Sequence, residues 1–212
     1  MNSNGKRLFV ARHGETVFNA AGRLQGTHAH TPLTSAGFRQ AEAMGAGLRA
    51  YLDGFDGVLD LVASDTGRAL QTLALVTERI GRDWHDARTD ERLNEIDVGS
   101  WGGLYYRDLL AQGPVIHGAH RLFQRLPDDA ESYADVARRL RSWIDDQQFA
   151  HDMILISHGM TSRVLRGLLC DLPDLDGFGA PVAKGLPQGS MVMICDGVEE
   201  MVVLGAGEGE KG

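Results

Sequence analysis

The sequence has few cysteines and no long apolar run. Its 212 residues include two cysteines, Cys170 and Cys195, each within an apolar stretch. Two are too few for a disulfide framework, and free thiols are common in such stretches. No run approaches the roughly 18 apolar residues of a membrane-spanning helix, and residues 1–6 lack the apolar core of a signal peptide. We therefore expect a cytoplasmic protein with no membrane partner.

Basic residues are fewer than acidic residues. Lys and Arg total 21 against 29 Asp and Glu, which gives a net charge of −8 and a pI near 5.4. Nucleic acids and anionic membranes select basic patches, so this balance argues against both as partners. A small anionic substrate is still compatible, because a few arginines in a cleft can dominate the local field.

Length and composition fit a single globular domain over residues 1–212. Hydrophobic residues make up 43% of the chain and charged residues 24%, enough for a substantial core. An α/β sheet with helices on both faces commonly reaches this size. Residues 205–212 are polar and glycine-rich, and we predict that this tail is disordered.

Two apolar runs end in the same way. The run 8–11 breaks into Arg12-His13-Gly14, and the run 153–156 breaks into Ser157-His158-Gly159. Each is typical of a buried strand that ends in a polar turn. The carboxyl ends of parallel strands meet in one crevice, where open α/β sheets hold their ligands. The sequence therefore predicts one pocket that contains both histidines.

Hydrophobic periodicity and turn signals predict the other elements. Thr34 or Ser35 caps the first long helix, Gly81 stops the second, and Ser132 with Asp135 forms a capping box for a third. Asp196-Gly197 signals a hairpin. The pattern predicts helices near residues 35–53, 67–80, 102–110, 115–126, 132–148 and 159–172, strands near 58–63, 84–87, 190–195 and 201–205, and a loop over the pocket mouth at 174–189.

The order of motifs resembles the histidine phosphatase superfamily, also called the phosphoglycerate-mutase-like family. The resemblance begins with Arg12-His13-Gly14-Glu15-Thr16, ends after Ser157-His158-Gly159 and spans roughly residues 7–195. It implies an α/β three-layer sandwich with helices on both faces of a mostly parallel sheet of about six strands, one of them an antiparallel edge strand. The motifs in between are Asn19, Gly22–Gly26, Pro32–Thr34, Gly37, Ser64-Asp65, Arg68-Ala69, Gln71-Thr72, Leu93–Glu95 and Gly99–Trp101.

His13 is the candidate nucleophile, which would form a covalent phosphohistidine. Its reactive nitrogen must be unprotonated near neutral pH, and the cations Arg12, Arg68 and a protonated His158 would favour that state. The other ring nitrogen should donate to a fixed acceptor, such as a backbone carbonyl in the following turn. The family resemblance implies the same roles.

Phosphate binding would fall to the two arginines, because guanidinium pairs with phosphate oxygens and stays charged. The Gly159 amide at a helix N-terminus would add a donor. Glu95 is the candidate general acid, chosen over the nearby acids Asp97 and Glu91 because the family's acid lies in this Asn-Glu segment. Asn19, Gln25 and Gly26 would line the substrate side of the pocket.

The remaining histidines invite a metal-site interpretation. His28, His30, His117 and His120 have no Cys-His framework or acidic ligand pattern beside them, and exposed loop histidines are common. We therefore expect no metal and no cofactor.

Two departures from the family pattern affect the pocket. Residues 27–31 make a loop one residue longer than usual that lacks the acid often found there, and Gly102-Gly103 follows Trp101 where the family often has Glu-Gly. The first puts the shape of the substrate pocket in doubt, and the second affects how the loop after Trp101 is tied down.

Three functions are compatible with these residues. We favour a phosphatase acting on a small phosphorylated metabolite, because the interval Leu104–Ser132 is shorter than the insertion that mutases carry. A cofactor-dependent phosphoglycerate mutase is the first alternative. A catalytically weak module that binds a phosphorylated ligand or a protein is the second alternative. Such a module is expected to have lost a catalytic histidine or a phosphate-binding arginine, and this sequence has kept them. The ester hydrolysed and the oligomeric state stay open.

Overall fold

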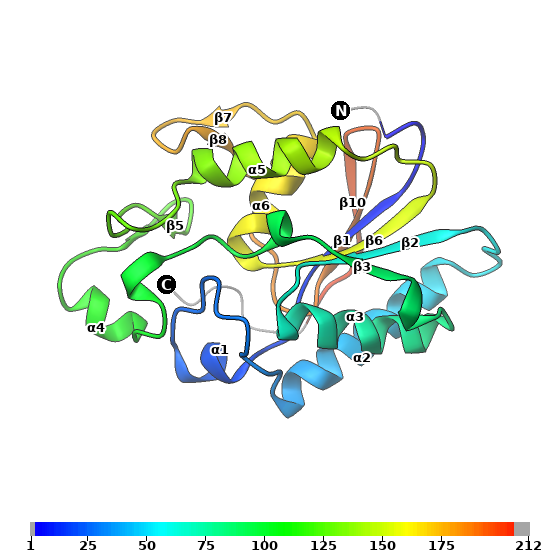
Figure 1. Cartoon of the computed structure of the whole chain (residues 1–212), viewed down its shortest axis with the longest axis horizontal. Helices are drawn as coiled ribbons and strands as arrows, with labels where there is room; N and C mark the ends of the chain where they lie inside the picture. Colours follow the sequence, from blue (N-terminus) through cyan, green and yellow to red (C-terminus); the bar gives the residue numbers. More distant parts are fainter. Residues whose placement is uncertain (1–2, 206–212) are drawn as a thin grey trace.

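The structure is a computed structural model that describes residues 3–205. Its centre is a six-stranded sheet in the order β10-β9-β1-β6-β2-β3 (Figure 1). The disordered tail predicted for 205–212 lies outside the described residues, apart from Gly205. The strands of the sheet are β1 (Leu8–Arg12), β2 (Leu59–Ala63), β3 (Ala87–Thr89), β6 (Asp152–Ser157), β9 (Met191–Cys195) and β10 (Val198–Val203).

The sheet is mostly parallel, as predicted. β1, β6, β2 and β3 pair in parallel, and β9 pairs antiparallel with β1. The antiparallel strand is not the edge strand that we expected, because β10 folds back outside β9. The reversal occurs at Asp196-Gly197, where both residues have positive φ angles, 45° and 82°. Such angles are those of the tight hairpin turns that match strand twist.

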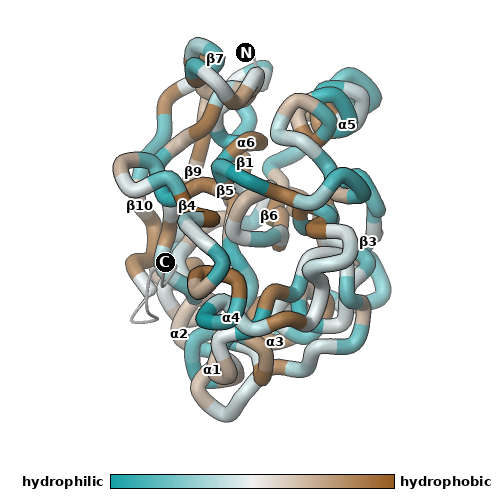
Figure 2. The backbone as a smooth tube through the Cα atoms, turned by 90° about the vertical axis from the view of Figure 1, so that its left-hand side faces the viewer, coloured by the Kyte–Doolittle hydropathy of each residue, from teal (hydrophilic) through white to brown (hydrophobic). Residues whose placement is uncertain are grey.

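Helices cover both faces of the sheet and bury two separate cores. Leu8 and Val10 of β1 contact one core, whereas Phe9 and Ala11 contact the other, because successive strand side chains alternate between faces. Figure 2 shows hydrophobic residues along β9 and mostly hydrophilic residues along α5. The first core packs under α5 (Tyr133–Asp145) and α6 (Gly159–Leu169), and the second packs under α2 (Ser35–Tyr51) and α3 (Gly67–Ile80).

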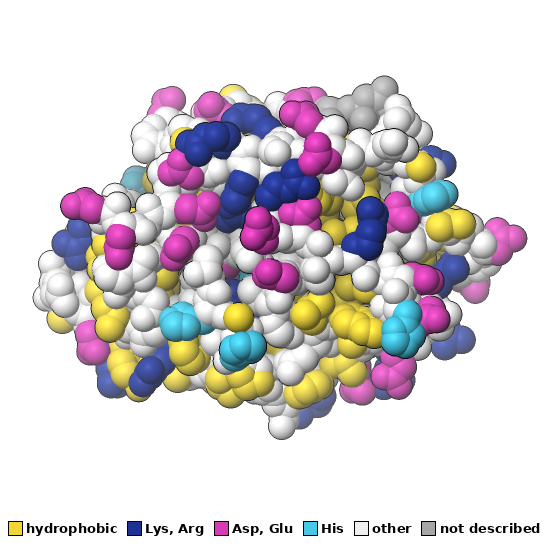
Figure 3. Space-filling view, viewed as in Figure 1, with side chains coloured by type: hydrophobic (Ala, Val, Ile, Leu, Met, Phe, Trp, Pro, Cys, Tyr) yellow, Lys and Arg dark blue, Asp and Glu magenta, His cyan; other side chains and the backbone are white. Residues whose placement is uncertain are grey.

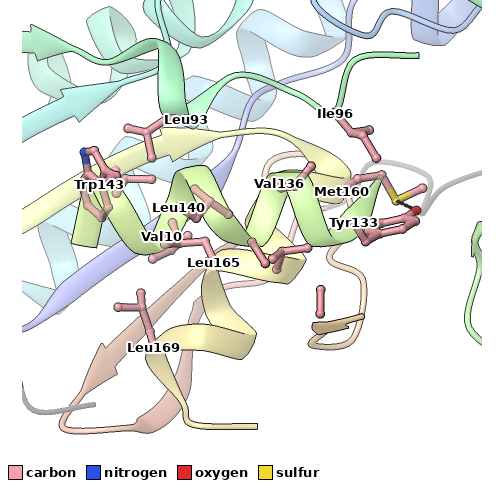
Figure 4. Close-up of a cluster of buried hydrophobic side chains, with 14 of the residues drawn as sticks. Val10, Leu93, Ile96, Tyr133, Val136, Leu140, Trp143, Met160, Leu165 and Leu169 are labelled. Carbon is pink, nitrogen blue, oxygen red and sulfur yellow. Dashed lines mark hydrogen bonds between the residues drawn. The ribbon is translucent and has the colours of Figure 1, made fainter. Parts of the chain in front are cut away.

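The core beneath α5 fixes the helix that carries the second histidine. Trp143 and Leu140 of α5 are almost fully buried together with Leu165 of α6 and Val10 of β1 (Figure 4). Burying a side chain of this size stabilises the fold by about 1.5–3 kcal/mol. This core therefore holds α6 firmly against α5 and β1.

The predicted helix ends are confirmed. Thr34 accepts from the Gly37 amide at the start of α2, and Ser132 exchanges hydrogen bonds with Asp135 at the start of α5. Gly81 ends α3 with φ 68°. These ends agree with the sequence because capping depends on neighbours three residues apart.

Two predictions of local structure are wrong. Trp84–Asp86 is a turn of 3₁₀ helix, and the strand that we expected there is β3, three residues further on. Residues 115–126 form a hairpin of β4 (Ile116–His117) and β5 (Leu122–Phe123) instead of a helix. The Phe123 amide donates to the Tyr133 hydroxyl at 3.0 Å, so contact with α5 selects the extended conformation.

Three smaller differences lie around the pocket. The helix expected over 102–110 is shortened to α4 (Tyr106–Leu110), because Gly103 takes a positive φ of 80°. The expected loop 174–189 contains the short hairpin of β7 (Asp174–Leu175) and β8 (Ala180–Pro181). A further short helix, α1 (Val17–Ala21), follows the first histidine motif.

The visible surface carries charges of both signs. In Figure 3, basic and acidic side chains are interspersed over the region of α5. Among residues 3–205, no helix has the length and apolar character that crossing a membrane requires.

Candidate active site

The two histidine motifs lie side by side at the carboxyl ends of β1 and β6. Arg12 is in register with Ser157, and the His13 amide donates to the Ser157 carbonyl at 3.1 Å. The ring centroids of His13 and His158 are 5.1 Å apart, and both side chains are buried. The two imidazoles therefore meet at the same edge of the sheet, as predicted, although only His13 lines the cavity there.

The His13 ring is held as a neutral imidazole with one fixed tautomer. Its Nδ1 lies 2.7 Å from the Gly14 carbonyl oxygen, which can only accept, so Nδ1 carries the proton. Nε2 is then the unprotonated nitrogen. Burial lowers the pKa of His13 well below its usual value, and the positive charges of Arg68 and Arg12 lower it further. The ring is therefore neutral at physiological pH, as a nucleophile requires.

Glycine is required at the turn after His13. A Cβ atom on Gly14 would lie 2.5 Å from the Gly37 carbonyl oxygen, and one on Gly37 would lie 2.1 Å from the Glu15 carbonyl oxygen. The two backbones approach too closely for any side chain. This contact locks the turn that carries the Gly14 carbonyl, the partner of His13.

His158 is also neutral, which corrects the expectation of a protonated ring. Arg68 donates its Nε–H to Nδ1 of His158 at 3.2 Å, so Nδ1 is an acceptor. Nε2 then carries the proton and donates to the Ser64 hydroxyl at 2.6 Å. Burial lowers the pKa of His158 well below its usual value, and Arg68 lowers it further. The cations that hold His13 neutral are the arginines alone.

Arg68 is the central cation of the pocket, although it is fully buried. Besides His158, its donors reach the carbonyls of Gly26 at 2.8 Å and His28 at 2.6 Å and the hydroxyl of Thr31 at 3.0 Å. Burial lowers the pKa of Arg68 to about 10, so it stays charged at neutral pH. This set of acceptors fixes its place in the pocket.

Glu95 is held at the N-terminus of α6. Its carboxylate accepts from the backbone amides of Met160 at 3.1 Å, Thr161 at 3.0 Å and Ile96 at 3.0 Å. The helix end that the sequence assigned to phosphate through Gly159 thus directs its next two amides at Glu95. Asp97, the competing acid, is used to bind the Gly99 amide at 2.9 Å.

His13, Arg68 and Glu95 line a small cavity of about 50 Å³, and His158 does not. That volume holds about four water molecules, so it fits a phosphate group and little more. A larger cavity of about 710 Å³ contains neither histidine, and we take the smaller one as the candidate site because the candidate nucleophile His13 lines it. The cavity is lined by Arg12, His13, Asn19, Arg23, Leu24, Gln25, Gly26, Arg68, Glu95, Ile96, Val98, Tyr106, Phe123 and Met160.

Thr16 orients the amide side chains of Asn19 and Gln25, a role that the sequence analysis did not predict. Its hydroxyl lies 2.9 Å from Oδ1 of Asn19 and 2.7 Å from Oε1 of Gln25, and its own amide donates to Asn19 Oδ1 at 3.1 Å. Because both amide oxygens face Thr16, both NH₂ groups turn away from it. These NH₂ groups are donors available to a phosphate in the cavity.

Replacing Thr16 by valine should therefore impair phosphate binding. We expect kcat/KM for a phosphate ester to fall about tenfold, mostly through KM, because two donors lose their orientation. The α1 cap is lost as well, at about 1 kcal/mol of stability. Thr16→Ser keeps the hydroxyl and should restore KM. Equal KM values for Thr16→Val and Thr16→Ser would show that Thr16 caps α1 and does not affect phosphate binding.

The two buried neutral histidines also predict a pH-dependent stability. Below the usual value of 6.5, the unfolded chain takes up a proton on each, whereas the folded chain does not. The unfolded state then binds more protons, so the free energy of unfolding falls as the pH drops, by up to about 1.4 kcal/mol per pH unit for each histidine.

Urea denaturation at several pH values between about 7.5 and 5.5 tests this slope. His13→Asn should unfold with a shallower pH dependence than the wild type, because one of the two groups is removed. An unchanged slope would contradict a neutral His13 in the folded state.

The two departures from the family pattern touch each other. A Cβ atom on Gly102 would lie 3.0 Å from Nε2 of His28, so the ring occupies the space above Gly102. The same loop supplies the His28 carbonyl and the Thr31 hydroxyl to Arg68. The loop 27–31 and the glycine at position 102 therefore fit together, and the loop reaches the phosphate pocket through Arg68.

The other histidines in the described part of the chain do not gather into a metal site. His28 contacts the ring of Phe18, and His117 stacks on His120 with centroids 4.9 Å apart. Within residues 3–205, His, Cys, Asp and Glu side chains form no group of three or more suited to a metal ion.

Sequence comparison agrees with this geometry. The model of the histidine phosphatase superfamily (branch 1) matches residues 8–184. The chain belongs to this superfamily. It is 32% identical over 178 residues to the protein named probable phosphoglycerate mutase GpmB from Yersinia enterocolitica, covering 79% of this chain and 76% of the relative.

Solved structures of the superfamily superpose along almost the whole chain. A mycobacterial glucosyl-3-phosphoglycerate phosphatase in complex with VO3 has a TM-score of 0.71 and 27% identity, covering 95% of this chain and 99% of that one. A protein titled mycobacterial hydrolase 1 has the same TM-score and identity and covers 96% and 99%. Phosphatases and a mutase are thus both among the relatives of this superfamily member.

Proposed function

We propose that the protein hydrolyses phosphomonoesters through a covalent phosphohistidine on His13, without a metal ion. The observation that carries the proposal is the state of the His13 ring. Nδ1 is fixed on the Gly14 carbonyl, Nε2 is unprotonated, and two arginines stand beside it. A neutral buried imidazole between cations is suited to attack an anionic phosphorus centre.

In the first step, Nε2 of His13 attacks phosphorus and the bond from phosphorus to the ester oxygen breaks. The leaving alkoxide takes a proton from Glu95, which must enter this step as a neutral carboxyl group and not as the carboxylate described above. In the second step, water attacks the phosphohistidine, the nitrogen–phosphorus bond breaks, and Glu95 takes the proton of that water. Phosphate leaves, and both His13 and Glu95 return to their starting states.

The other residues stabilise charge on the transferring phosphoryl group. Arg12 would pair with its oxygens, the positive charge of Arg68 would stabilise them, and the oriented amides of Asn19 and Gln25 would add neutral donors. His158 accepts from Nε of Arg68 and so aims that guanidinium. Gly26 supplies a carbonyl to the same guanidinium. Arg12 and the amides of Asn19 and Gln25 would thus bind the phosphoryl group, whereas His158 and Gly26 would position Arg68.

A small phosphorylated metabolite is the substrate that we propose. The cavity of about 50 Å³ admits the phosphate, and the alcohol part must extend toward the opening. The similarity to a glucosyl-3-phosphoglycerate phosphatase supports hydrolysis as the reaction.

Phosphoglycerate mutation is the second candidate, because the Yersinia relative carries that name. Mutase chemistry uses the same phosphohistidine but returns the phosphoryl group to the substrate instead of to water. The interval between α4 and α5 is short and holds the small hairpin of β4 and β5, which favours the hydrolase.

Phosphate release from phenyl phosphate in the presence of a chelator tests the proposal. We expect turnover with phenyl phosphate, and no conversion of 3-phosphoglycerate in the presence of catalytic bisphosphoglycerate. Isomerisation without net phosphate release would establish the mutase. Activity that disappears in chelator and returns with a divalent metal would overturn the phosphohistidine mechanism.

A further inference from the structure

The segment that carries Glu95 is held in place by other elements of the fold. Glu95 lies between the 3₁₀ turns Glu91–Leu93 and Gly99–Trp101 and belongs to no helix or strand. Its neighbours Leu93 and Ile96 are fully buried in the core beside α5 and α6 (Figure 4). Apolar packing of this kind is non-directional. Hydrogen bonds are therefore needed to fix the direction in which the Glu95 carboxyl group points.

Three consecutive backbone carbonyls before Glu95 each accept a hydrogen bond from a side chain of a different element. The pairs are Arg139 of α5 with the Arg92 carbonyl, the Ser157 hydroxyl at the end of β6 with the Leu93 carbonyl (2.9 Å), and the Thr161 hydroxyl of α6 with the Asn94 carbonyl (2.7 Å). Side chains of distant segments thus do here what a helix or a strand does elsewhere for its own backbone.

Arg139 connects these contacts to the helix end that binds Glu95. Besides the Arg92 carbonyl, its guanidinium donates to the Thr161 hydroxyl at 3.4 Å and to the two carboxylate oxygens of Glu131 at 2.8 Å and 3.1 Å. The Thr161 amide is in turn one of the helix amides that donate to Glu95, at 3.0 Å. One guanidinium therefore contacts both the segment of Glu95 and a residue that binds its carboxylate.

Glu131 extends the same network to the other side of Glu95. Its carboxylate accepts from the Asp97 amide at 3.0 Å, and its own amide donates to the Asp97 carbonyl at 2.9 Å. The side chains of Arg139 and Glu131 are 18% and 25% exposed, so water screens this ion pair less than a pair on the open surface. Arg139 thus ties the chain before Glu95 to the chain after it.

We propose that Arg139 is a positioning residue for Glu95 and fixes the direction from which the carboxyl group meets the leaving oxygen. The inference rests on the proposed function, in which Glu95 gives a proton to that oxygen and later takes one from water. Arg139 does not line the catalytic cavity, so it acts by holding residues 92–97 and Thr161 in one fixed relation. A shift of about 1 Å in a catalytic group can cost about 10²-fold in rate.

Two esters that differ in their leaving group test this role. Phenolate leaves efficiently only with a proton, whereas dinitrophenolate leaves without one. The ratio of kcat/KM for dinitrophenyl phosphate to kcat/KM for phenyl phosphate therefore reports on the general acid. We expect Arg139→Met to raise this ratio about tenfold or more, in the same direction as Glu95→Gln. Partial unfolding lowers both values equally and leaves the ratio unchanged, so a wild-type ratio in Arg139→Met would overturn the proposal.

Matched variants on α5 locate the effect. Arg138→Met makes the same change at the adjacent residue, which is exposed and pairs with Asp135, and it should leave the ratio of the two kcat/KM values unchanged. Arg139→Lys keeps the charge without the planar fork and should restore part of the wild-type ratio. If Arg138→Met raised the ratio as much as Arg139→Met, the cause would be the loss of charge from the helix, and the proposal would fail.

A double variant shows whether Arg139 acts through Glu95. In the Glu95→Gln background, Arg139→Met should leave the ratio unchanged, because the group that Arg139 positions no longer gives a proton. A further severalfold rise would show an effect independent of Glu95 and would contradict the proposal. If Glu95→Gln alone keeps the wild-type ratio, the proposed function fails at its general acid, and hydrogen exchange then decides the positioning role.

Amide hydrogen exchange, followed by NMR, measures the placement of Glu95 without turnover. The Met160 and Thr161 amides lie in the first turn of α6, where the helix supplies no acceptor, and both donate to Glu95. In Arg139→Met we expect these two amides to exchange about tenfold faster, and the Leu165 amide, deeper in α6, to keep its rate. If the wild type hydrolyses neither ester, the proposed function fails, yet faster exchange still supports the positioning of Glu95 by Arg139. Unchanged exchange at Met160 and Thr161 overturns it whatever the enzyme hydrolyses.

Discussion

Replacing His13 by asparagine is expected to reduce phosphate release by about 10⁴-fold or more, as the loss of a nucleophile does elsewhere. Asparagine has an amide nitrogen near the position of Nδ1, so it can still donate to the Gly14 carbonyl. It has no counterpart of Nε2, the nitrogen that attacks. The fold should therefore survive while the chemistry is lost.

Steady-state hydrolysis of phenyl phosphate measures the loss, and thermal unfolding checks the fold. His85→Ala, at an exposed histidine outside the pocket, should match the wild type in activity. A phosphorylated form of the wild-type chain, trapped by rapid quench and seen by intact mass, should be missing from His13→Asn. A variant that keeps more than a few per cent of activity would show that His13 is not the nucleophile.

Replacing Arg68 by methionine should have the second largest effect, on both activity and stability. Methionine keeps the length and volume of the stem but removes every donor. His158 Nδ1 and the carbonyls of Gly26 and His28 then lose their partner in a buried site. We expect the free energy of unfolding to fall by about 3 kcal/mol and kcat/KM by roughly 10²–10³.

Arg79→Met is the matched control, because Arg79 is half-exposed on the same helix and pairs only with Glu42 in the described structure. It should change stability by less than about 1 kcal/mol. Arg68→Lys should recover part of the rate, since it keeps the charge without the planar fork. If Arg68→Met kept kcat/KM within a few fold of the wild type, Arg68 would not contribute to phosphate binding.

Local sequence was sufficient for much of the scaffold. The strands that end at Arg12 and Ser157 are short apolar runs that break into a polar, glycine-containing turn, and the run together with this turn signal predicted a buried strand. The caps at Thr34 and Ser132 involve residues three apart, so their signals also lie within one short window. The family motifs then predicted which side chains would gather.

Residues 115–126 show where local information was insufficient. The segment contains the buried residues Leu122 and Phe123. A short apolar pattern like this one is compatible with a helix or with a strand. Tyr133, ten residues further along the chain, decides between them through its hydroxyl bond to the Phe123 amide. A pattern of apolar residues cannot indicate a partner that only the folded chain supplies.

The sequence by itself determined which residues are candidates for the chemistry, because residue type and motif order are local properties. Tertiary structure alone decided their states. His158 is neutral because Arg68 and Ser64, 90 and 94 residues away in sequence, hold its two nitrogens. Glu95 faces α6 because the Thr161 amide, 66 residues away, reaches it. Protonation and orientation depend on which dipoles surround a group after folding, and that environment is built from distant segments.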